Sequence, residues 1–121
     1  RHVRHEQRLV KRGGRLEELV WKAGGLYGAA IDRITYWLEK AAATAENERQ
    51  AAVLRKLIEF YRTGDLKTFD EYTILWVQET EAQVDFTNGF TETYGDPLGL
   101  KASWEAMPTS KTWKPRRGQR N

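Results

Sequence analysis

The middle of the chain carries apolar residues at the spacing of three amphipathic helices. In residues 27–43, apolar side chains recur every three or four positions, and charged residues stand between them. Residues 47–62 and 66–78 repeat the pattern, and each stretch follows a side chain suited to an N-cap, Asn47 or Asp65. The short connections predict that the three helices are antiparallel neighbours.

The apolar stripes of these helices are the predicted core. Trp37, Leu57, Ile58 and Phe69 are expected to be central members of it. The stripes comprise Tyr27, Ala30, Ile31, Ile34, Trp37, Leu38 and Ala41, then Val53, Leu54, Leu57, Ile58 and Tyr61, then Leu66, Phe69, Thr73, Trp76 and Val77.

Two glycine pairs interrupt the chain before the first helix. Residues 9–12 and 15–21 flank Gly13-Gly14, which predicts a β-hairpin that turns at the glycines. A short helix over residues 16–21 is the competing interpretation. The second pair, Gly24-Gly25, belongs to no phosphate-binding loop, because neither the GxGxxG order nor a following GKS or GKT is present.

Residues 84–94 alternate with a period of two, which predicts a β-strand with one apolar face. Glu92 and Tyr94 have the parity of Val84, Phe86 and Phe90. They stand roughly 6.5–7 Å apart along a strand, so carboxylate and phenol can reach one ligand together. A carboxylate on an apolar face needs a partner, because burying it unpaired is costly.

The segment 96–99 reads Asp-Pro-Leu-Gly, which fits a type I turn, and a second extended stretch with Trp104 and Glu105 follows it. The turn directs the chain back toward the first strand, so Glu92, Tyr94 and Glu105 are candidate members of one site. A hairpin in which the glutamate and tyrosine are merely hydrogen-bonded is the alternative.

Together these patterns predict an α+β fold, mainly α with short β pieces, in which a three-helix antiparallel segment is joined by β-hairpins. With 121 residues the chain is one small domain at most, or part of a larger one. We expect residues 1–15 to be a basic N-terminal segment, 16–107 the core, and 108–121 a basic, disordered tail.

Charge is distributed unevenly along the chain. Residues 16–107 carry nine Lys or Arg and sixteen Asp or Glu, a balance of −7, whereas residues 1–15 and 108–121 each balance at +5. Basic ends can indicate nucleic-acid-binding arms. Trp113 is the single aromatic residue among these basic residues, and no helix-turn-helix or RNP pattern is present, so nucleic-acid binding is not expected.

Composition excludes several kinds of site. The chain has no cysteine, so a disulfide framework and a thiolate metal site are impossible. No apolar run reaches 18 residues, so no membrane-spanning helix is expected. His2 and His5 are the only histidines, and no third ligand is placed beside them, so we predict no metal site there.

The run GFTETYGDPLG at residues 89–99, with Trp76 before it and Trp-Glu at 104–105, resembles the dipeptidyl peptidase III family, peptidase family M49. The resemblance extends from about Leu9 to about Ala106. It implies a zinc-dependent exopeptidase that removes dipeptides from the N-terminus of short peptides. It also implies the lower, non-zinc lobe of a two-lobed enzyme, whose wide cleft binds an oligopeptide.

The resemblance assigns roles to four residues. Positions matching Glu92 and Glu105 help hold the amine end of the substrate in this family. The position matching Tyr94 stabilises the transition state, and Trp76 matches a tryptophan near the substrate cleft. We carry over these positions as substrate-binding residues Glu92, Glu105 and Trp76 and catalytic residue Tyr94.

The zinc-binding motifs of the family, HExxGH and an EECRAE-like run, do not occur here. Zinc is therefore expected in the full-length family and not on this chain, which we interpret as an inactive fragment that contributes the substrate N-terminus-binding wall. Its exposed apolar surface could support self-association. A non-enzymatic helical interaction module with basic ends is the alternative function.

The resemblance ends near both termini, so we interpret residues 1–8 and 108–121 as non-native, out-of-frame translation around a genuine core. This hypothesis accounts for the basic ends without a functional cause. No signal peptide is visible, and the similarity to bacterial members implies a cytoplasmic protein. Secretion or a periplasmic location stays open, because we expect the true N-terminus to be missing.

Overall fold

The computed structural model describes residues 7–95 and 102–111. These residues form three helices and two antiparallel β-hairpins, which confirms the predicted α+β class. The elements are β1 (Gln7–Arg12), β2 (Arg15–Val20), α1 (Gly28–Ala43), α2 (Glu48–Thr63), α3 (Leu66–Gln78), β3 (Val84–Glu92) and β4 (Ser103–Ser110).

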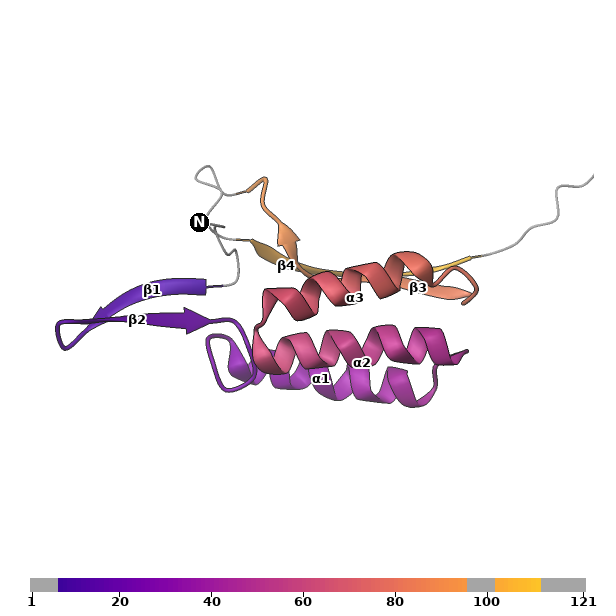
Figure 1. The fold of residues 1–121 in the computed structure, drawn as a ribbon, viewed down its shortest axis with the longest axis horizontal. Coiled ribbons are helices and arrows are strands. Elements are labelled where there is room, and N and C mark those ends of the chain that lie inside the picture. The colour runs from indigo at the N-terminus through magenta and orange to yellow at the C-terminus, as the bar shows by residue number, and fades with distance from the viewer. Residues whose placement is uncertain (1–6, 96–101, 112–121) are drawn as a thin grey trace, which may run out of the picture.

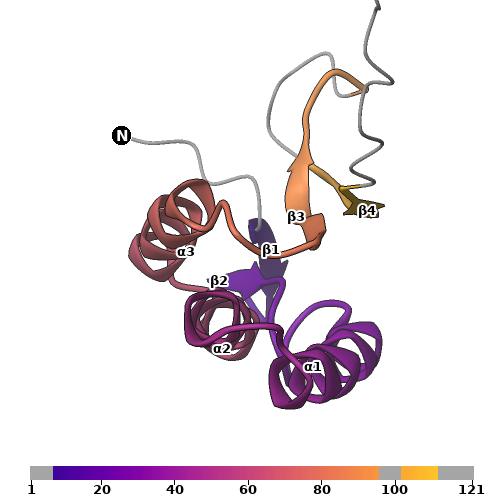
Figure 2. The same cartoon turned by 90° about the vertical axis from the view of Figure 1, so that its right-hand side faces the viewer.

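The helices lie side by side with α2 between α1 and α3, and the β3–β4 hairpin runs along one side of them (Figures 1 and 2). The β1–β2 hairpin projects beyond the end of the helices (Figure 1). Its two-residue loop consists of Gly13 and Gly14 with φ of 53° and 82°, the positive values that a type I′ turn requires. The hairpin prediction is confirmed, and the alternative of a helix over residues 16–21 is wrong.

Local capping defines the helices where the sequence predicted it. The Asn47 side chain accepts a hydrogen bond from the Gln50 N–H at the start of α2, and the Asp65 side chain accepts one from the Lys67 N–H at the start of α3. Helix α2 ends at Gly64, whose φ of 67° is the left-handed conformation that glycine adopts without strain. In the described residues no helix has the length and apolar character needed to cross a bilayer.

The core lies where α2 meets its neighbours. Leu57 and Ile58 are buried as predicted, and the half-buried Phe69 packs against them from α3. The buried hydrophobic cluster comprises Trp21, Ile31, Leu38, Val53, Leu54, Leu57, Ile58, Phe60, Tyr61 and Tyr72.

The prediction that Trp37 is a core residue is wrong, because its side chain is 66% exposed. Among the described helices and strands, α1 packs against α2 alone, so it buries one narrow line of residues, Ile31, Thr35 and Leu38. Trp37 lies about 100° around the helix from Leu38 and therefore outside this line. The sequence pattern gave α1 a wider apolar face than a helix with a single neighbour can bury.

Three predictions fall at the edges of the described region. Strand β4 continues through Ser110, so the predicted core boundary at residue 107 lies inside a paired strand. The predicted turn at residues 96–99 lies outside the described residues, and so do His2 and His5.

Candidate functional site

A β-bulge at Thr91 decides which way the predicted site residues face. Phe90 pairs with Trp104, but the next pair along the hairpin is Glu92 with Ser103, so Thr91 is the extra residue. Because side chains alternate along a strand, the bulge moves Glu92 from the face of Phe90 to the face of Glu105. The expectation that Glu92 shares the apolar face of β3 is thus wrong.

This displacement brings the two acids into contact. A hydrogen bond between the Glu92 and Glu105 carboxyls is the first cause that raises the pKa of Glu92, and partial burial and the negative charge of Glu105 act in the same direction. The Thr91 hydroxyl lies 3.4 Å from Glu105 Oε1. Two neighbouring carboxyls repel each other when both are ionised, so the pair favours a bound proton or a bound cation.

Tyr94 joins this pair from beyond the end of β3. The interaction of its hydroxyl with the Glu92 carboxylate opposes the rise in the pKa of that carboxyl. The Tyr94 side chain is 89% exposed, so its ring is open to a ligand. The structure therefore places Glu92, Tyr94 and Glu105 together, and we refer to these three residues as the acidic site.

No basic side chain neutralises the acidic site in the described part of the chain. The ion pairs found there are surface pairs of the helices and of β1–β2, and none includes Glu92 or Glu105. Two ionised carboxyls in contact without a cation repel each other, and a positively charged ligand bound beside them would offset this repulsion.

Trp76 lies away from the acidic site. Its indole N–H donates a hydrogen bond of 2.9 Å to Asp85 Oδ1, near the beginning of β3. Asp85 precedes Glu92 by seven residues, which is about 23 Å of extended chain. The structure does not bring Trp76 into contact with the three clustered residues, and its predicted contact with substrate stays a prediction.

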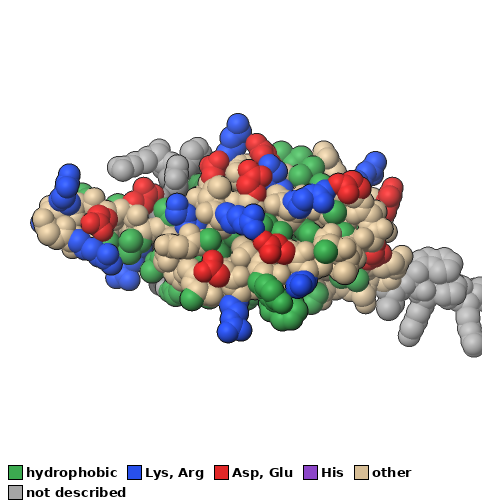
Figure 3. Space-filling view, turned by 90° about the horizontal axis from the view of Figure 1, so that it is seen from below, with side chains coloured by type: hydrophobic (Ala, Val, Ile, Leu, Met, Phe, Trp, Pro, Cys, Tyr) green, Lys and Arg blue, Asp and Glu red, His purple; other side chains and the backbone are tan. Residues whose placement is uncertain are grey.

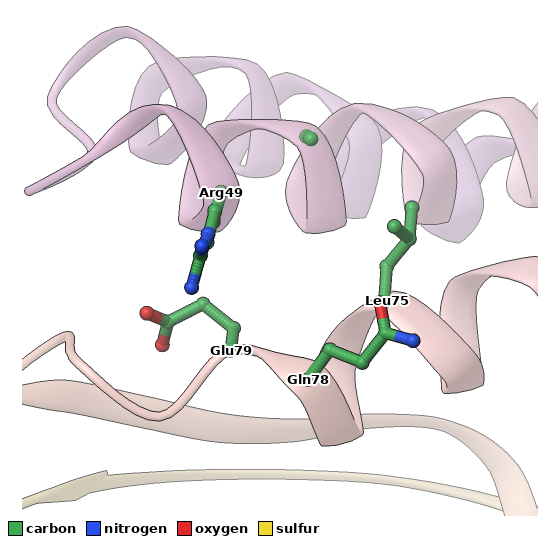
Figure 4. Close-up of a pocket in the computed structure, with 5 residues that line it drawn as sticks. Arg49, Leu75, Gln78 and Glu79 are labelled. Atoms are coloured by element: carbon green, nitrogen blue, oxygen red, sulfur yellow. The ribbon is translucent and has the colours of Figure 1, made fainter.

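A cavity of about 470 Å³ opens between α2 and α3. Arg49 and Glu79 approach each other across it, and Leu75, Gln78 and Ala52 complete its lining (Figure 4). Its charged groups already have partners within the protein: Glu79 accepts hydrogen bonds from Asn47 and from the Ala82 N–H, and Arg49 pairs with Glu81. The cavity lies near the start of β3 and is separate from the acidic site.

The residues that the structure describes do not offer a zinc site. Within 7–95 and 102–111, no three His, Cys, Asp or Glu side chains gather closely enough to hold a metal ion. Glu92 and Glu105 form only a pair, with a tyrosine as third member. The zinc that the family resemblance implies does not fit the donors of this segment.

Sequence reasoning missed two residues that shape the acidic site. Tyr61 was assigned to the apolar stripe of α2, yet its hydroxyl bonds to Asn88 on β3 and accepts a hydrogen bond from Trp104 on β4. Thr91 belongs to the stretch 84–94 that was predicted to be a regular strand, although it is the bulge residue. The sequence did contain one indication for Tyr61: a tyrosine in a buried apolar stripe has a hydroxyl that needs a hydrogen-bond partner.

Comparison with known proteins agrees with the fold and the motif. The chain matches the model of peptidase family M49 over residues 5–111. It is 31% identical to human dipeptidyl peptidase 3 over 83 residues, which is 69% of this chain and 11% of that protein. Dipeptidyl peptidase 3 of Dictyostelium discoideum is likewise 31% identical, with 69% of this chain and 12% of that protein covered.

The structure of DPP III from Caldithrix abyssi superimposes with a TM-score of 0.78 at 23% identity, covering 89% of this chain and 20% of that one. The chain thus spans only about a tenth of the length of the curated relatives it matches. The agreement between the fold, the motif around Glu92 and Tyr94 and the family match leads to one conclusion: the chain belongs to peptidase family M49.

Proposed function

We propose that this chain forms a wall of a dipeptidyl peptidase III-type cleft and binds the free N-terminal ammonium of an oligopeptide through Glu92 and Glu105. The observation that supports this proposal is the contact between two carboxyls that have no cation in the described residues. An ammonium group placed between them would remove their repulsion and form charge-assisted hydrogen bonds with both. A neutral, acetylated N-terminus would do neither.

Tyr94 has a separate task in this proposal. Its hydroxyl, which lies close to the Glu92 carboxyl, would donate to the scissile carbonyl oxygen as negative charge develops there. The exposed ring leaves the hydroxyl free to turn toward a bound peptide. Glu92 and Glu105 would therefore position the peptide, while Tyr94 would stabilise the transition state.

The chain by itself is proposed to be inactive, because the HExxGH motif and the second glutamate run are absent from its sequence. Other segments of a complete protein would hold the zinc, which supplies the activated water in this family. The expected result is that the pure chain releases no dipeptide from peptide substrates, with or without added zinc. Turnover that needs zinc and stops with a chelator would contradict this expectation.

The experiment that tests the wall function compares peptides that differ only at the amine. In a complete M49 enzyme carrying this core, Glu92→Gln should weaken the binding of free-amine peptides by roughly tenfold to a hundredfold, the range expected for a hydrogen bond to a charged group. The same change should alter the binding of N-acetylated peptides by less than about twofold. Equal losses of affinity for both peptide classes would contradict the amine-binding role of Glu92.

The alternative function, a non-enzymatic interaction module, has one observation in its favour. Large apolar side chains are exposed on two helices, with Tyr36 and Trp37 on α1 and Ile74 and Val77 on α3. On one face of the molecule, hydrophobic side chains lie among the charged ones (Figure 3). Sedimentation over a range of concentrations tests this observation: self-association of the wild type that the Trp37→Ser variant loses would show that the exposed side chains form an interface.

A further inference from the structure

The Tyr61 hydroxyl connects three elements at one buried point. Tyr61 lies on the last turns of α2 and its side chain is 0% exposed. The hydroxyl donates a hydrogen bond to Asn88 Oδ1 on β3 and accepts one of 2.8 Å from the Trp104 indole N–H on β4. Burial raises the pKa of Tyr61, so the hydroxyl stays protonated and keeps donating.

Both partners of this hydroxyl flank the acidic site. Trp104 is the residue before Glu105, and it pairs with Phe90, the residue before the bulge. Asn88 stands on the other side of Gly89, which is the direct cross-strand partner of Glu105. One oxygen atom is therefore bonded to both strands within a few residues of the point where the two acids meet.

The hairpin needs a constraint at this point. A two-stranded ribbon is only marginally stable by itself, and a slip of one residue would turn Glu105 to the opposite face. The other supports nearby are apolar: the Phe90 ring lies 4.6 Å from the Trp21 ring, and a Cβ on Gly89 would lie 3.3 Å from the Phe69 ring. Apolar contacts hold the hairpin against the helices and are not directional, whereas hydrogen bonds to Asn88 and Trp104 constrain each strand at one defined atom.

We propose that Tyr61 is a positioning residue for the acidic site: its hydroxyl, shared between Asn88 and Trp104, fixes the register of β3 and β4 at the bulge and so holds Glu92 against Glu105. Tyr61 touches neither acid and is not catalytic. The inference rests on the proposed function only for what the acids bind. Their geometry, and the part that Tyr61 plays in it, can be measured without any peptide.

The test uses the 121-residue chain and measures the pKa of Glu92 by NMR titration of its side-chain carboxyl carbon. Tyr61→Phe removes one oxygen and keeps the ring in the core. With the register loosened, the Glu92 carboxyl should move away from Glu105, and its pKa should fall toward the ordinary value of a glutamate. Among the described residues, the groups that face Glu92 are the Glu105 carboxyl and the Tyr94 hydroxyl, and neither is changed by this substitution.

Tyr72→Phe is the matched control, because it also deletes one hydroxyl from a buried tyrosine that contacts the same core. Burial raises the pKa of Tyr72 to about 12, and Asp85, at the opposite end of β3 from Glu92, adds to the rise. This control should leave the pKa of Glu92 at its wild-type value. A general loosening of the fold would instead shift it in both variants.

Trp104→Phe removes the hydrogen bond to Tyr61 from the β4 side. It is the second test if Tyr61→Phe fails to fold, because Trp104 is 41% exposed and its replacement should disturb the core less. It should lower the pKa of Glu92 as Tyr61→Phe does, and the double variant should add little to the larger single effect. The proposal is overturned if folded Tyr61→Phe or Trp104→Phe keeps the wild-type pKa of Glu92. It is also overturned if Tyr72→Phe shifts that pKa equally. Failure of amine recognition in the complete enzyme would leave these results unchanged.

Discussion

The carboxyl groups at the two ends of β3 have opposite kinds of neighbour. At the beginning of the strand, the Glu46 carboxylate accepts hydrogen bonds from the Gln83 and Val84 N–H groups at 2.8 and 2.9 Å. The Gln50 amide donates to the Val84 carbonyl at 2.8 Å, and the same region holds Asp85 through the Trp76 indole. At the far end, Glu92 meets another acid.

The pKa shifts of two glutamates express this difference. Burial by itself would raise the pKa of Glu79, but hydrogen bonds from the Ala82 N–H, the Asn47 amide and the Glu81 N–H outweigh it and lower the pKa. The pKa of Glu92 is raised, first by its hydrogen bond with Glu105. The first carboxylate stabilises the fold as an anion, whereas the second lacks a positive partner. A carboxylate whose neighbours destabilise its anion is the one available to a cationic ligand.

The largest expected effect lies at the far end of β3. In a complete M49 enzyme carrying this core, Tyr94→Phe should lower kcat by about 10²–10³-fold, the range seen when one oxyanion donor is removed. The KM should change much less, because this hydrogen bond strengthens only as the transition state forms. Steady-state kinetics on one peptide measures both constants. A rise in KM with an unchanged kcat would instead assign Tyr94 to ground-state binding.

A smaller effect is expected at the beginning of the strand. Trp76→Phe removes the indole donor to Asp85, whose Oδ1 also accepts from the Phe86 N–H at 2.8 Å and so keeps a partner. The free energy of unfolding should therefore fall by about 0.5–1.5 kcal/mol, the net value of an ordinary hydrogen bond. Urea denaturation of the chain measures this change.

The same variant sharpens the comparison between the two ends. In the complete enzyme, Trp76→Phe should preserve the preference for free-amine over acetylated peptides, because the indole lies about 23 Å along the strand from Glu92. A loss of that preference would show that Trp76 acts on the amine site and that the separation between the ends is misread.

Features defined by neighbouring residues could be predicted from the sequence. The helices follow from periodicity, and the starts of α2 and α3 follow from Asn47 and Asp65, each of which bonds to an N–H within three residues. The β1–β2 hairpin follows from Gly13-Gly14, since few other residue pairs adopt two positive φ values. The local physical chemistry of these segments is sufficient.

Features that depend on a distant partner could not be predicted in this way. The bulge at Thr91 exists only relative to β4, so the alternation of residues 84–94 gave no sign that Glu92 changes face. The exposure of Trp37 depends on how many helices cover α1, and the periodicity of α1 does not contain that number. The family resemblance identified Glu105 as a partner of Glu92, but the bulge that makes the contact became visible only in the structure.

The smallest expected effect concerns stability and pH. Because the pKa of Glu92 is raised in the folded chain above the ordinary value of a glutamate, the folded state binds this proton more tightly than the unfolded state does. The resulting stabilisation is fully present below the unfolded pKa and is lost as pH rises through the folded pKa. Glu105→Gln should remove this loss, because the amide can donate to the Glu92 carboxylate and brings no charge. Urea denaturation should then find the variant more stable than the wild type at pH 7, with no such gain at pH 4.

Glu79→Gln is a control for which we expect the opposite change in stability at pH 7. The pKa of Glu79 is lowered in the fold, so its stabilisation is present above the unfolded pKa and is lost as pH falls through the folded pKa. This variant should be less stable than the wild type at pH 7, and the difference should shrink as the pH is lowered below 4. If both variants change the free energy of unfolding in the same direction at pH 7, the two ends of β3 do not differ electrostatically. That result would contradict the role of Glu92 and Glu105 as a cation-binding pair.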